Sequence, residues 1–260
     1  MDNALEFAAH LAQETGQLLK NYFHSSNLQT SLKADRTVVT EADLAADDMI
    51  RQAIEAAYPN DRLLTEESDT LVDGIDTPVW VIDPLDGTSN FSLGLPIWGV
   101  SIARLVNGFP QIGVLYFPVM DELLTAERGK GAALNGQPLK TRPASEHPPY
   151  TFFVCCSRTY KRYNVTLRYK TRILGASSYD YAAVARSSAM LGFQASPKIW
   201  DLAAGWLILQ EAGAVVETFE GPAPFPLKAG VEYNHYSFSL VMGADRSAAD
   251  KVRQGIQKRP

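Results

Sequence analysis

The chain of 260 residues is 46% hydrophobic, which is enough for a packed core, and it carries a formal net charge of -5. This acidic balance gives no basic footprint for nucleic acid or anionic membranes, so a small soluble ligand fits better. The opening sequence MDNALEFAAHLAQETG is acidic and amphipathic, unlike a signal peptide, and no apolar run reaches the ~18 residues of a membrane span. We therefore expect a cytoplasmic protein with neither nucleic-acid nor membrane partners.

The N-terminal part of the sequence predicts two helices. Apolar residues recur at helical spacing over residues 3–23, which predicts an amphipathic helix packed on a sheet. Thr40 begins Thr-Glu-Ala-Asp, a capping-box pattern in which the side chains of Thr40 and Asp43 satisfy free amides at a helix start. That helix should run to about Ala57, because Pro59 ends it.

A sheet is predicted from Val79 onward. The β-rich runs VWVI, WGVSIARLV, QIGVLYF and ELLTAE are separated by turn signals such as Asn107-Gly108, which indicates largely antiparallel pairing. The polar, proline-rich LKTRPASEHPPY then marks a boundary near residues 142–150. We therefore expect an N-terminal α+β domain over residues 1–145 and a C-terminal α/β domain over residues 146–260.

The C-terminal part should alternate strands and helices. TFFVCCS and AVVETF are apolar runs typical of strands, and YDYAAVARSSAML lies between them. LAAGWLILQEAG predicts a helix that Gly213 closes. Cys155 and Cys156 are adjacent in an apolar stretch, which fits neither a disulfide framework nor a zinc spacing, so we interpret them as buried thiols.

The stretch WVIDPLDGTSNF, residues 80–91, carries the chemistry. Asp83 and Asp86 follow an apolar strand and can converge where Pro84 bends the chain. Paired carboxylates repel unless a divalent cation lies between them, and Mg²⁺ takes oxygen ligands from carboxylates and from backbone carbonyls such as that of Leu85. The same residue types are also common in surface turns, which is the alternative interpretation.

Neighbouring residues add to this pattern. Gly87 lets a phosphate approach the backbone, and Thr88 offers a hydroxyl that orients a water. The acidic pair Glu66-Glu67 lies upstream in RLLTEESD, where a solvated loop is the simpler interpretation. Asp201, in KIWDLAAGW, stands where a helix N-cap belongs, so capping alone would account for it.

The chain resembles the inositol monophosphatase-like, Mg²⁺-dependent, lithium-sensitive phosphatases. WVIDPLDGTSNF resembles the first signature of that family, and WDLAAGWLILQEAGAVV resembles the second. LLTEES, KADRTVVTEAD and AERGKGAALNGQPL add three more segments in the family's order. The resemblance covers nearly the whole chain and implies the five-layered αβαβα sandwich of mixed α+β and α/β type, usually as a homodimer.

The resemblance also implies two or three Mg²⁺ ions per active site. Glu66, Asp83 and the Leu85 carbonyl would hold the first ion, and a third, weaker ion would also involve Glu66. The second ion would be held by Asp83, Asp86 and Asp201. The activity implied is hydrolysis of a phosphate monoester by metal-activated water, without a phosphoenzyme.

Other roles follow from the same resemblance. Glu66 and Thr88 would orient the water, and the amides of Gly87 and Thr88 would receive the phosphate. Asp43 would either support Thr88 or only cap its helix. Lys33 would lie near the phosphate on a mobile loop.

Substrate choice would depend on the second domain. The family segment that borders the substrate matches Gly175, Ala176 and Ser177, with the last two residue types exchanged. Gln194 stands where inositol-hydrolysing enzymes have a glutamate, and a neutral amide offers one acceptor oxygen instead of two, so specificity for myo-inositol is in doubt. Lys198 would contact a second anionic group or remain solvated. Residues 147–171 form a short segment that would leave the pocket open.

Relatives hydrolyse several substrates, so alternatives remain. An inositol-1-phosphate-like ester is the first expectation. Histidinol phosphate, fructose 1,6-bisphosphate and 3′-phosphoadenosine phosphates are alternatives within the same chemistry. A non-catalytic binding or regulatory protein on this fold is the alternative of another class.

Overall fold

The structure is a computed structural model that describes residues 4–23, 28–32, 38–68 and 70–259. Lys33 lies outside the described residues. The α-helices are α1 (Ala4–Tyr22), α2 (Glu41–Ala57), α3 (Thr88–Ser92), α4 (Thr159–Arg162), α5 (Ser177–Ala185), α6 (Ile199–Glu211) and α7 (Arg246–Gly255). Short 3₁₀ turns cover Ala144–Glu146 and Tyr233–His235.

The strands group into one larger sheet, one smaller sheet and several two-stranded ribbons. The larger sheet contains β3 (Arg62–Thr65), β5 (Val79–Asp86), β6 (Gly99–Val106), β7 (Phe109–Phe117), β8 (Glu122–Glu127), β9 (Gly131–Leu134) and β10 (Gln137–Leu139). The smaller sheet contains β11 (Phe152–Cys155), β13 (Lys170–Arg172), β14 (Ala189–Gln194), β15 (Val215–Glu220) and β17 (Ser239–Gly243). The ribbons pair β1 (Thr30–Leu32) with β2 (Val38–Thr40), β4 (Leu71–Val72) with β16 (Val231–Glu232), and β12 (Tyr163–Val165) with β18 (Ile256–Lys258).

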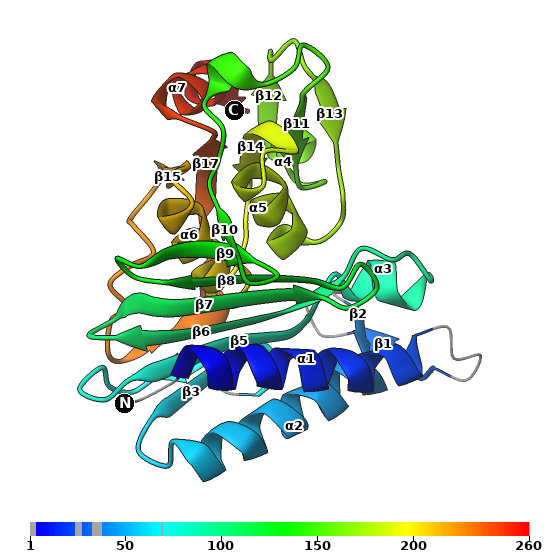
Figure 1. Cartoon of the computed structure of the whole chain (residues 1–260), viewed down its shortest axis with the longest axis vertical. Helices are drawn as coiled ribbons and strands as arrows, with labels where there is room; N and C mark the ends of the chain where they lie inside the picture. Colours follow the sequence, from blue (N-terminus) through cyan, green and yellow to red (C-terminus); the bar gives the residue numbers. More distant parts are fainter. Residues whose placement is uncertain (1–3, 24–27, 33–37, 69, 260) are drawn as a thin grey trace.

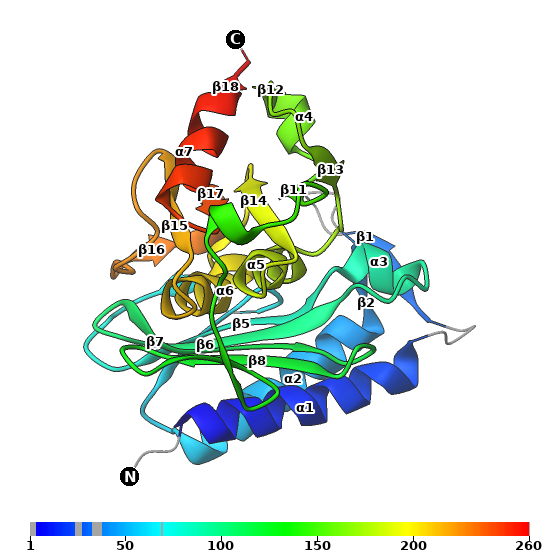
Figure 2. The same cartoon turned by 45° about the horizontal axis from the view of Figure 1, so that its top comes forward.

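Five layers stack in the described part of the chain. Figure 1 shows α1 and α2 against one face of the larger sheet and α5 and α6 against the other, and Figure 2 shows the same order from another side. The smaller sheet lies on α5 and α6, and α7 covers its far face. This confirms the αβαβα sandwich.

Sheet pairing agrees with the sequence interpretation. The larger sheet has the order β10-β9-β8-β7-β6-β5-β3 and is antiparallel except for the parallel pair of β3 and β5. The smaller sheet has the order β13-β11-β14-β17-β15, with β11 parallel to β13 and β14 and with β17 antiparallel to both its neighbours. The alternation of strands and helices is present as predicted, but the smaller sheet is mixed, because β17 runs antiparallel to β14 and β15.

The middle helical layer carries much of the core. Helix α6 is apolar nearly all round because both of its sides are covered by sheets, and Leu202, Leu207 and Ile208 are fully buried. One buried cluster extends from Val81 in the larger sheet through α6 to Leu240 in the smaller one. The chain passes between the sheets after β10, and the domain division at residue 145 stays a prediction.

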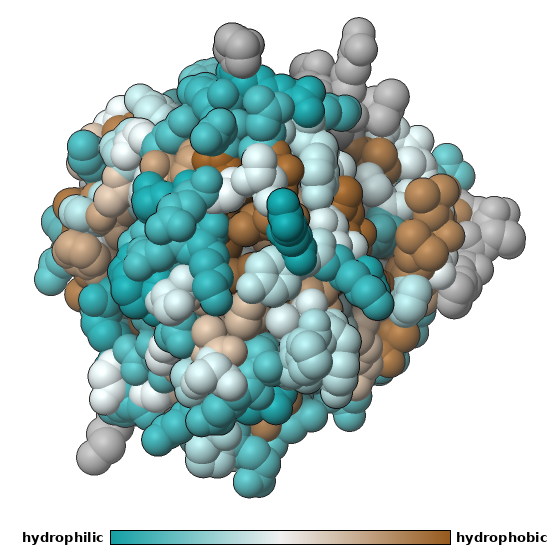
Figure 3. All heavy atoms as spheres, turned by 90° about the horizontal axis from the view of Figure 1, so that it is seen from above, coloured by the Kyte–Doolittle hydropathy of each residue, from teal (hydrophilic) through white to brown (hydrophobic). Residues whose placement is uncertain are grey.

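The outermost layer, helix α7, is covered on one side only. Seen from above, the face that includes α7 is largely hydrophilic with scattered hydrophobic patches (Figure 3). Helix α7 buries Ala248, Ala249 and Val252 on one side only. Among the described residues, no helix combines the length and apolar composition that a membrane span requires.

Close packing of α5 on α6 yields a stability prediction. A Cβ added at Gly205 would lie 2.3 Å from Cδ2 of Tyr181, a fully buried side chain. We expect Gly205→Ala to lower the free energy of unfolding by roughly 1–2 kcal/mol, because overpacking outweighs the better helix propensity of alanine. Urea denaturation would measure this. Gln210→Ala, at an exposed position of the same helix, serves as the control and should stay within about 0.5 kcal/mol of the wild type.

Candidate active site

A bulge in β5 brings its two aspartates together. Asp83 pairs with Ser101 and Asp86 with Gly99, so Pro84 and Leu85 oppose a single residue of β6. Strand residues three apart normally face opposite sides of a sheet, and the extra residue corrects this alternation. Pro84 is tolerated there because a bulge does not need its missing amide hydrogen. The predicted convergence is correct, although it occurs within the strand instead of after its end.

Three carboxylates from separate elements meet beside this bulge. Carboxylate oxygens of Glu66, Asp83 and Asp201 all lie within 4.8 Å of one another. Glu66 follows the end of β3, and its amide donates to the carbonyl of Ile82 on β5 at 3.2 Å. The parallel pairing of β3 with β5 therefore places this glutamate next to Asp83. An all-oxygen ligand set of this kind fits a hard divalent cation.

Asp86 reaches across to the second half of the chain. Its Oδ1 accepts a hydrogen bond from the amide of Ser177 at 3.2 Å, and its Oδ2 accepts one from the amide of Ser178 at 2.6 Å. These two amides are the first of α5 and have no partner within the helix. Asp86, which precedes Ser177 by 91 residues, therefore accepts the hydrogen bonds that the helix itself cannot provide. The positive end of the α5 dipole favours the negative charge there.

Asp201 occupies a different helix position from the one predicted. Helix α6 begins at Ile199 with Lys198 as N-cap residue, so Asp201 is the third helical residue and not the N-cap. Its Oδ2 accepts from the backbone amide of Lys198 at 2.8 Å. A carboxylate used in this way keeps lone pairs for another partner, so Asp201 can cap its helix and also face Glu66 and Asp83.

Burial and mutual repulsion raise the pKa of these aspartates. Loss of water raises the pKa of Asp83 well above its usual range, and the charges of Glu66, Asp86 and Asp201 add to the effect. The pKa of Asp201 is also raised well above its usual range, first by burial and then by the charges of Asp86 and Glu66. Burial raises the pKa of Asp86 to about 6, although hydrogen bonds from α5 oppose the shift. A bound cation would remove the repulsion, so the residues present fit a metal ion.

Thr88 is held by Asp43. Thr88 Oγ1 lies 3.0 Å from Asp43 Oδ1 and 3.0 Å from the carbonyl oxygen of Leu85. The other oxygen of Asp43 accepts from the amide of Thr40 at 2.8 Å and from its hydroxyl at 2.6 Å. The predicted capping box is therefore present, and the contact with Thr88 coexists with it because each oxygen of Asp43 has its own partners.

Asp47 is a residue that sequence analysis missed. It lies one turn after Asp43 on α2, is 3% exposed, and accepts from the hydroxyl of Ser68 at 3.0 Å. Ser68 is also hydrogen-bonded to Thr65, the residue before Glu66. Helix α2 thus holds both Thr88 and the loop of Glu66. A second inward-facing aspartate at i+4 from Asp43 was the available signal.

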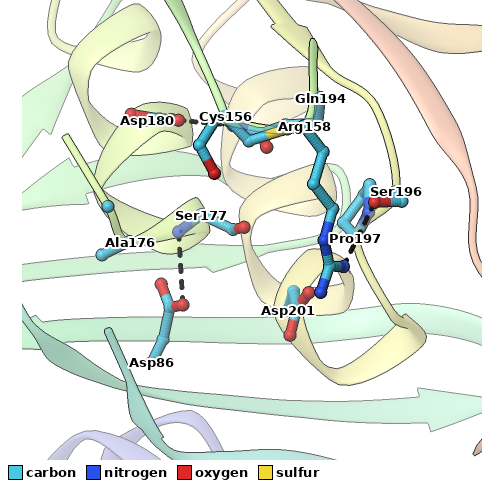
Figure 4. Close-up of a pocket in the computed structure, with 12 residues that line it drawn as sticks. Asp86, Cys156, Arg158, Ala176, Ser177, Asp180, Gln194, Ser196, Pro197 and Asp201 are labelled. Carbon is cyan, nitrogen blue, oxygen red and sulfur yellow. Dashed lines mark hydrogen bonds between the residues drawn. The ribbon is translucent and has the colours of Figure 1, made fainter. Parts of the chain in front are cut away.

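A pocket of about 210 Å³ opens beside Asp86 and Asp201. The predicted substrate residues Gly175, Ala176, Ser177 and Gln194 all line it. Figure 4 shows the last three of them around the pocket. Gly87 approaches them closely, since a Cβ added to it would lie 3.1 Å from the Cβ of Ala176. The positive φ of 91° at Gly87 also requires glycine.

Other residues of the pocket were not predicted. Arg158 and Cys156 line it, so Cys156 is only half-buried, whereas Cys155 is buried as expected. Asp180 is fully buried and accepts a short hydrogen bond from Nε2 of Gln194. Lys198 is not among the lining residues, and its Nζ donates to the carbonyl oxygen of Asn234. That bond lies at the surface, which agrees with solvation of this lysine more than with a role in the pocket.

Comparison with known proteins identifies the family of this site. The sequence model described as inositol monophosphatase family matches residues 1–250. The chain belongs to the inositol monophosphatase family. Family membership and the acidic cluster together support a metal-dependent phosphatase as the class of protein.

Relatives of this family member carry different names. Nus factor SuhB of Pasteurella multocida is 36% identical over 233 residues, covering 85% of this chain and 87% of that protein. A histidinol-phosphatase of Chlorobaculum parvum is 36% identical over 228 residues, covering 84% and 86%. The crystal structure of extragenic suppressor protein suhB from Bartonella henselae superposes with a TM-score of 0.82 at 29% identity, covering 98% of each chain. The fold and family are thus shown, whereas only the histidinol-phosphatase among these three names specifies a substrate.

Buried Asp86 predicts a pH-dependent stability. Its pKa of about 6 lies above the ordinary 3.8, so the folded state binds the proton more tightly than the unfolded state does. The stability that this group contributes is therefore fully present below pH 3.8 and is lost as pH rises through 6, by about 3 kcal/mol at most over the whole range. Urea denaturation in a chelator would measure it. Asp86→Asn should make this part of the profile less steep without removing it, because the raised pKa values of Asp83 and Asp201 also contribute to the slope. Asp48→Asn, at an exposed site on α2, should retain the wild-type slope.

Proposed function

We propose that this protein hydrolyses a small-molecule phosphate monoester with Mg²⁺ as cofactor and without a phosphoenzyme. One observation carries the proposal: carboxylate oxygens of Glu66, Asp83 and Asp201 lie within 4.8 Å of one another, beside the carboxylate of Asp86. Glu66, Asp83 and the carbonyl of Leu85 would hold one ion, and Asp83, Asp86 and Asp201 a second. A third, weaker ion would also use Glu66. When bound, these ions would polarise the phosphate ester and lower the pKa of the attacking water.

The surrounding residues would orient that water and receive the phosphate. With Asp43 accepting the hydroxyl hydrogen of Thr88, the oxygen of Thr88 is left to accept a hydrogen bond from water. Glu66 would accept the second hydrogen of the same water. Gly87 and Thr88 open α3, where the first amides of a helix lack intrahelical partners, so these two amides would receive the phosphate oxygens.

The pocket supports a compact substrate. Its volume of about 210 Å³ is small for a ligand site. We propose an inositol-1-phosphate-like ester, bordered by Gly175, Ala176, Ser177 and Gln194. The histidinol-phosphatase relative favours histidinol phosphate as an alternative within the same chemistry, beside fructose 1,6-bisphosphate and 3′-phosphoadenosine phosphates.

A second candidate function is a non-catalytic binding or regulatory role. The relatives named Nus factor SuhB favour it, because that name is not the name of an enzyme. The set of carboxylates beside Thr88 favours catalysis. We further propose that the protein is a lithium-sensitive, cytoplasmic homodimer that needs neither nucleic acid nor a membrane, and light scattering on the purified protein would test the dimer.

Removal of one carboxylate tests the hydrolytic function. We expect wild-type protein to release phosphate from one of the four substrates only when Mg²⁺ is present, and Asp83→Asn to lower kcat/KM by about 100-fold or more because both proposed ions would lose a ligand. Phosphate release would be measured colorimetrically. Asp48→Asn is the control and should keep full activity. Absence of release from every substrate, while calorimetry still shows Mg²⁺ binding, would favour the non-catalytic role.

Asp47 provides a separate prediction. Asp47→Ala should raise the Mg²⁺ concentration for half-maximal activity by about tenfold or more, because the loop of Glu66 would lose its support from α2. A Mg²⁺ titration of activity, with folding checked by circular dichroism, would measure the change. Asp48→Ala is the matched control on the same helix. A variant that is less stable but titrates like wild type would show that Asp47 serves the fold alone.

A further inference from the structure

Arg158 places a guanidinium in the pocket. Its backbone precedes α4, and its side chain extends into the pocket towards Asp201 (Figure 4). Nη1 donates to the hydroxyl of Ser196 at 3.3 Å. Among the residues that the structure describes, no carboxylate forms an ion pair with this guanidinium. Its charge is therefore not compensated by a direct partner.

The charges that line the pocket are arranged in two groups. Asp86, Asp180 and Asp201 are the acidic residues of its wall, and Arg158 is the one cation among the described residues that line it. Asp86 and Asp201 belong to the acidic cluster. Asp180 accepts a hydrogen bond from Gln194, and burial raises the pKa of its carboxyl well above the usual range, which favours the uncharged form. If Asp86 and Asp201 hold cations, as proposed above, their charges are neutralised. The guanidinium then remains as a positive charge that faces the ligand.

The other groups around Arg158 are neutral. Ser157 and Ser196 contribute hydroxyls, Cys156 contributes a thiol, and Gln194 contributes an amide whose nitrogen is already bonded to Asp180. A guanidinium with several free donors binds a carboxylate or a phosphate through two parallel hydrogen bonds. The neutral hydroxyl groups of a polyol bind a guanidinium more weakly, because they carry no negative charge and do not match its two parallel donors. The chemistry of this wall therefore favours an anion.

We propose that Arg158 is a specificity-determining residue that binds a second anionic group of the substrate, so that the preferred substrates are compact phosphate monoesters with an additional carboxylate or phosphate. This inference rests on the proposed phosphatase activity, which places the scissile phosphate at the acidic cluster, and among the proposed substrates it favours fructose 1,6-bisphosphate and 3′-phosphoadenosine phosphates over an inositol-1-phosphate-like ester. The second anion then lies at the Arg158 side of the same pocket. The small volume of the pocket limits the distance between the two groups.

Matched substrate pairs test the role of Arg158. 3-Phosphoglycerate and glycerol 3-phosphate differ in a carboxylate against a hydroxymethyl group, and fructose 1,6-bisphosphate and fructose 1-phosphate differ in a second phosphate. Arg158→Ala should lower kcat/KM by about 10- to 100-fold for the preferred substrate that carries a second anionic group. For the member of the same pair that lacks this group, kcat/KM should change by less than about threefold. Arg158→Lys should restore part of the loss. Lys161→Ala, an exposed cation on α4, is the control.

A binding measurement keeps this inference separate from hydrolysis. 3-Phosphonopropionate and 3-hydroxypropylphosphonate contain no ester bond that could be cleaved. Titration calorimetry with Mg²⁺ should show tighter binding of the carboxylate compound to the wild type, and Arg158→Ala should remove that preference. If this occurs while no ester is hydrolysed, the phosphatase proposal fails and the role of Arg158 stands.

Two outcomes would overturn the proposal for Arg158. An equal loss for both members of each pair would mean that Arg158 acts on the phosphate common to them. No loss for either member would mean that the guanidinium is a solvated surface group. The pair that responds would also tell whether the second anion is a carboxylate or a phosphate.

Discussion

Packing several carboxylates into one buried place is the constraint on which the arrangement of this molecule depends. Burial of Asp83 and Asp86 is unfavourable, and their mutual repulsion with Glu66 adds to the cost. Backbone amides offset part of it, because Leu85 donates to Asp83, the start of α5 donates to Asp86, and Lys198 donates to Asp201. Two helices of the middle layer thus begin at the acidic cluster, and a cation would supply the remaining compensation.

The middle layer serves the core and the site at once. Helices α5 and α6 bury their sides between the two sheets and present their N-termini to the carboxylates. Gly205 allows the close approach of the two helices at Tyr181. The position of the site is therefore fixed by the same packing that stabilises the fold, and α2 supports it from the opposite face through Asp43 and Asp47.

Much of this arrangement was predictable, because periodicity and capping are local properties. The helices at residues 4–22 and 41–57, the antiparallel strands and the capping box of Thr40 follow from neighbouring residues in the chain. The bulge that aligns Asp83 with Asp86 depends on register with β6, which no local pattern contains. Arg158 was missed for a related reason, since only tertiary packing places the segment before α4 beside the pocket. The roles assigned to the site residues stay predictions.

The capping of α5 by Asp86 has a consequence for how such a protein can diversify. The acidic cluster comes mostly from residues before 87, whereas Arg158, Gln194 and most of the pocket wall come from residues after 155. If the protein has the proposed function, exchange of the later segment between relatives is a route to chimeras with other substrate preferences and the same early acidic residues. Such exchange is restricted at two points, because a donor segment must bring both an aspartate at the start of α6 and a helix whose first amides fit the carboxylate of Asp86.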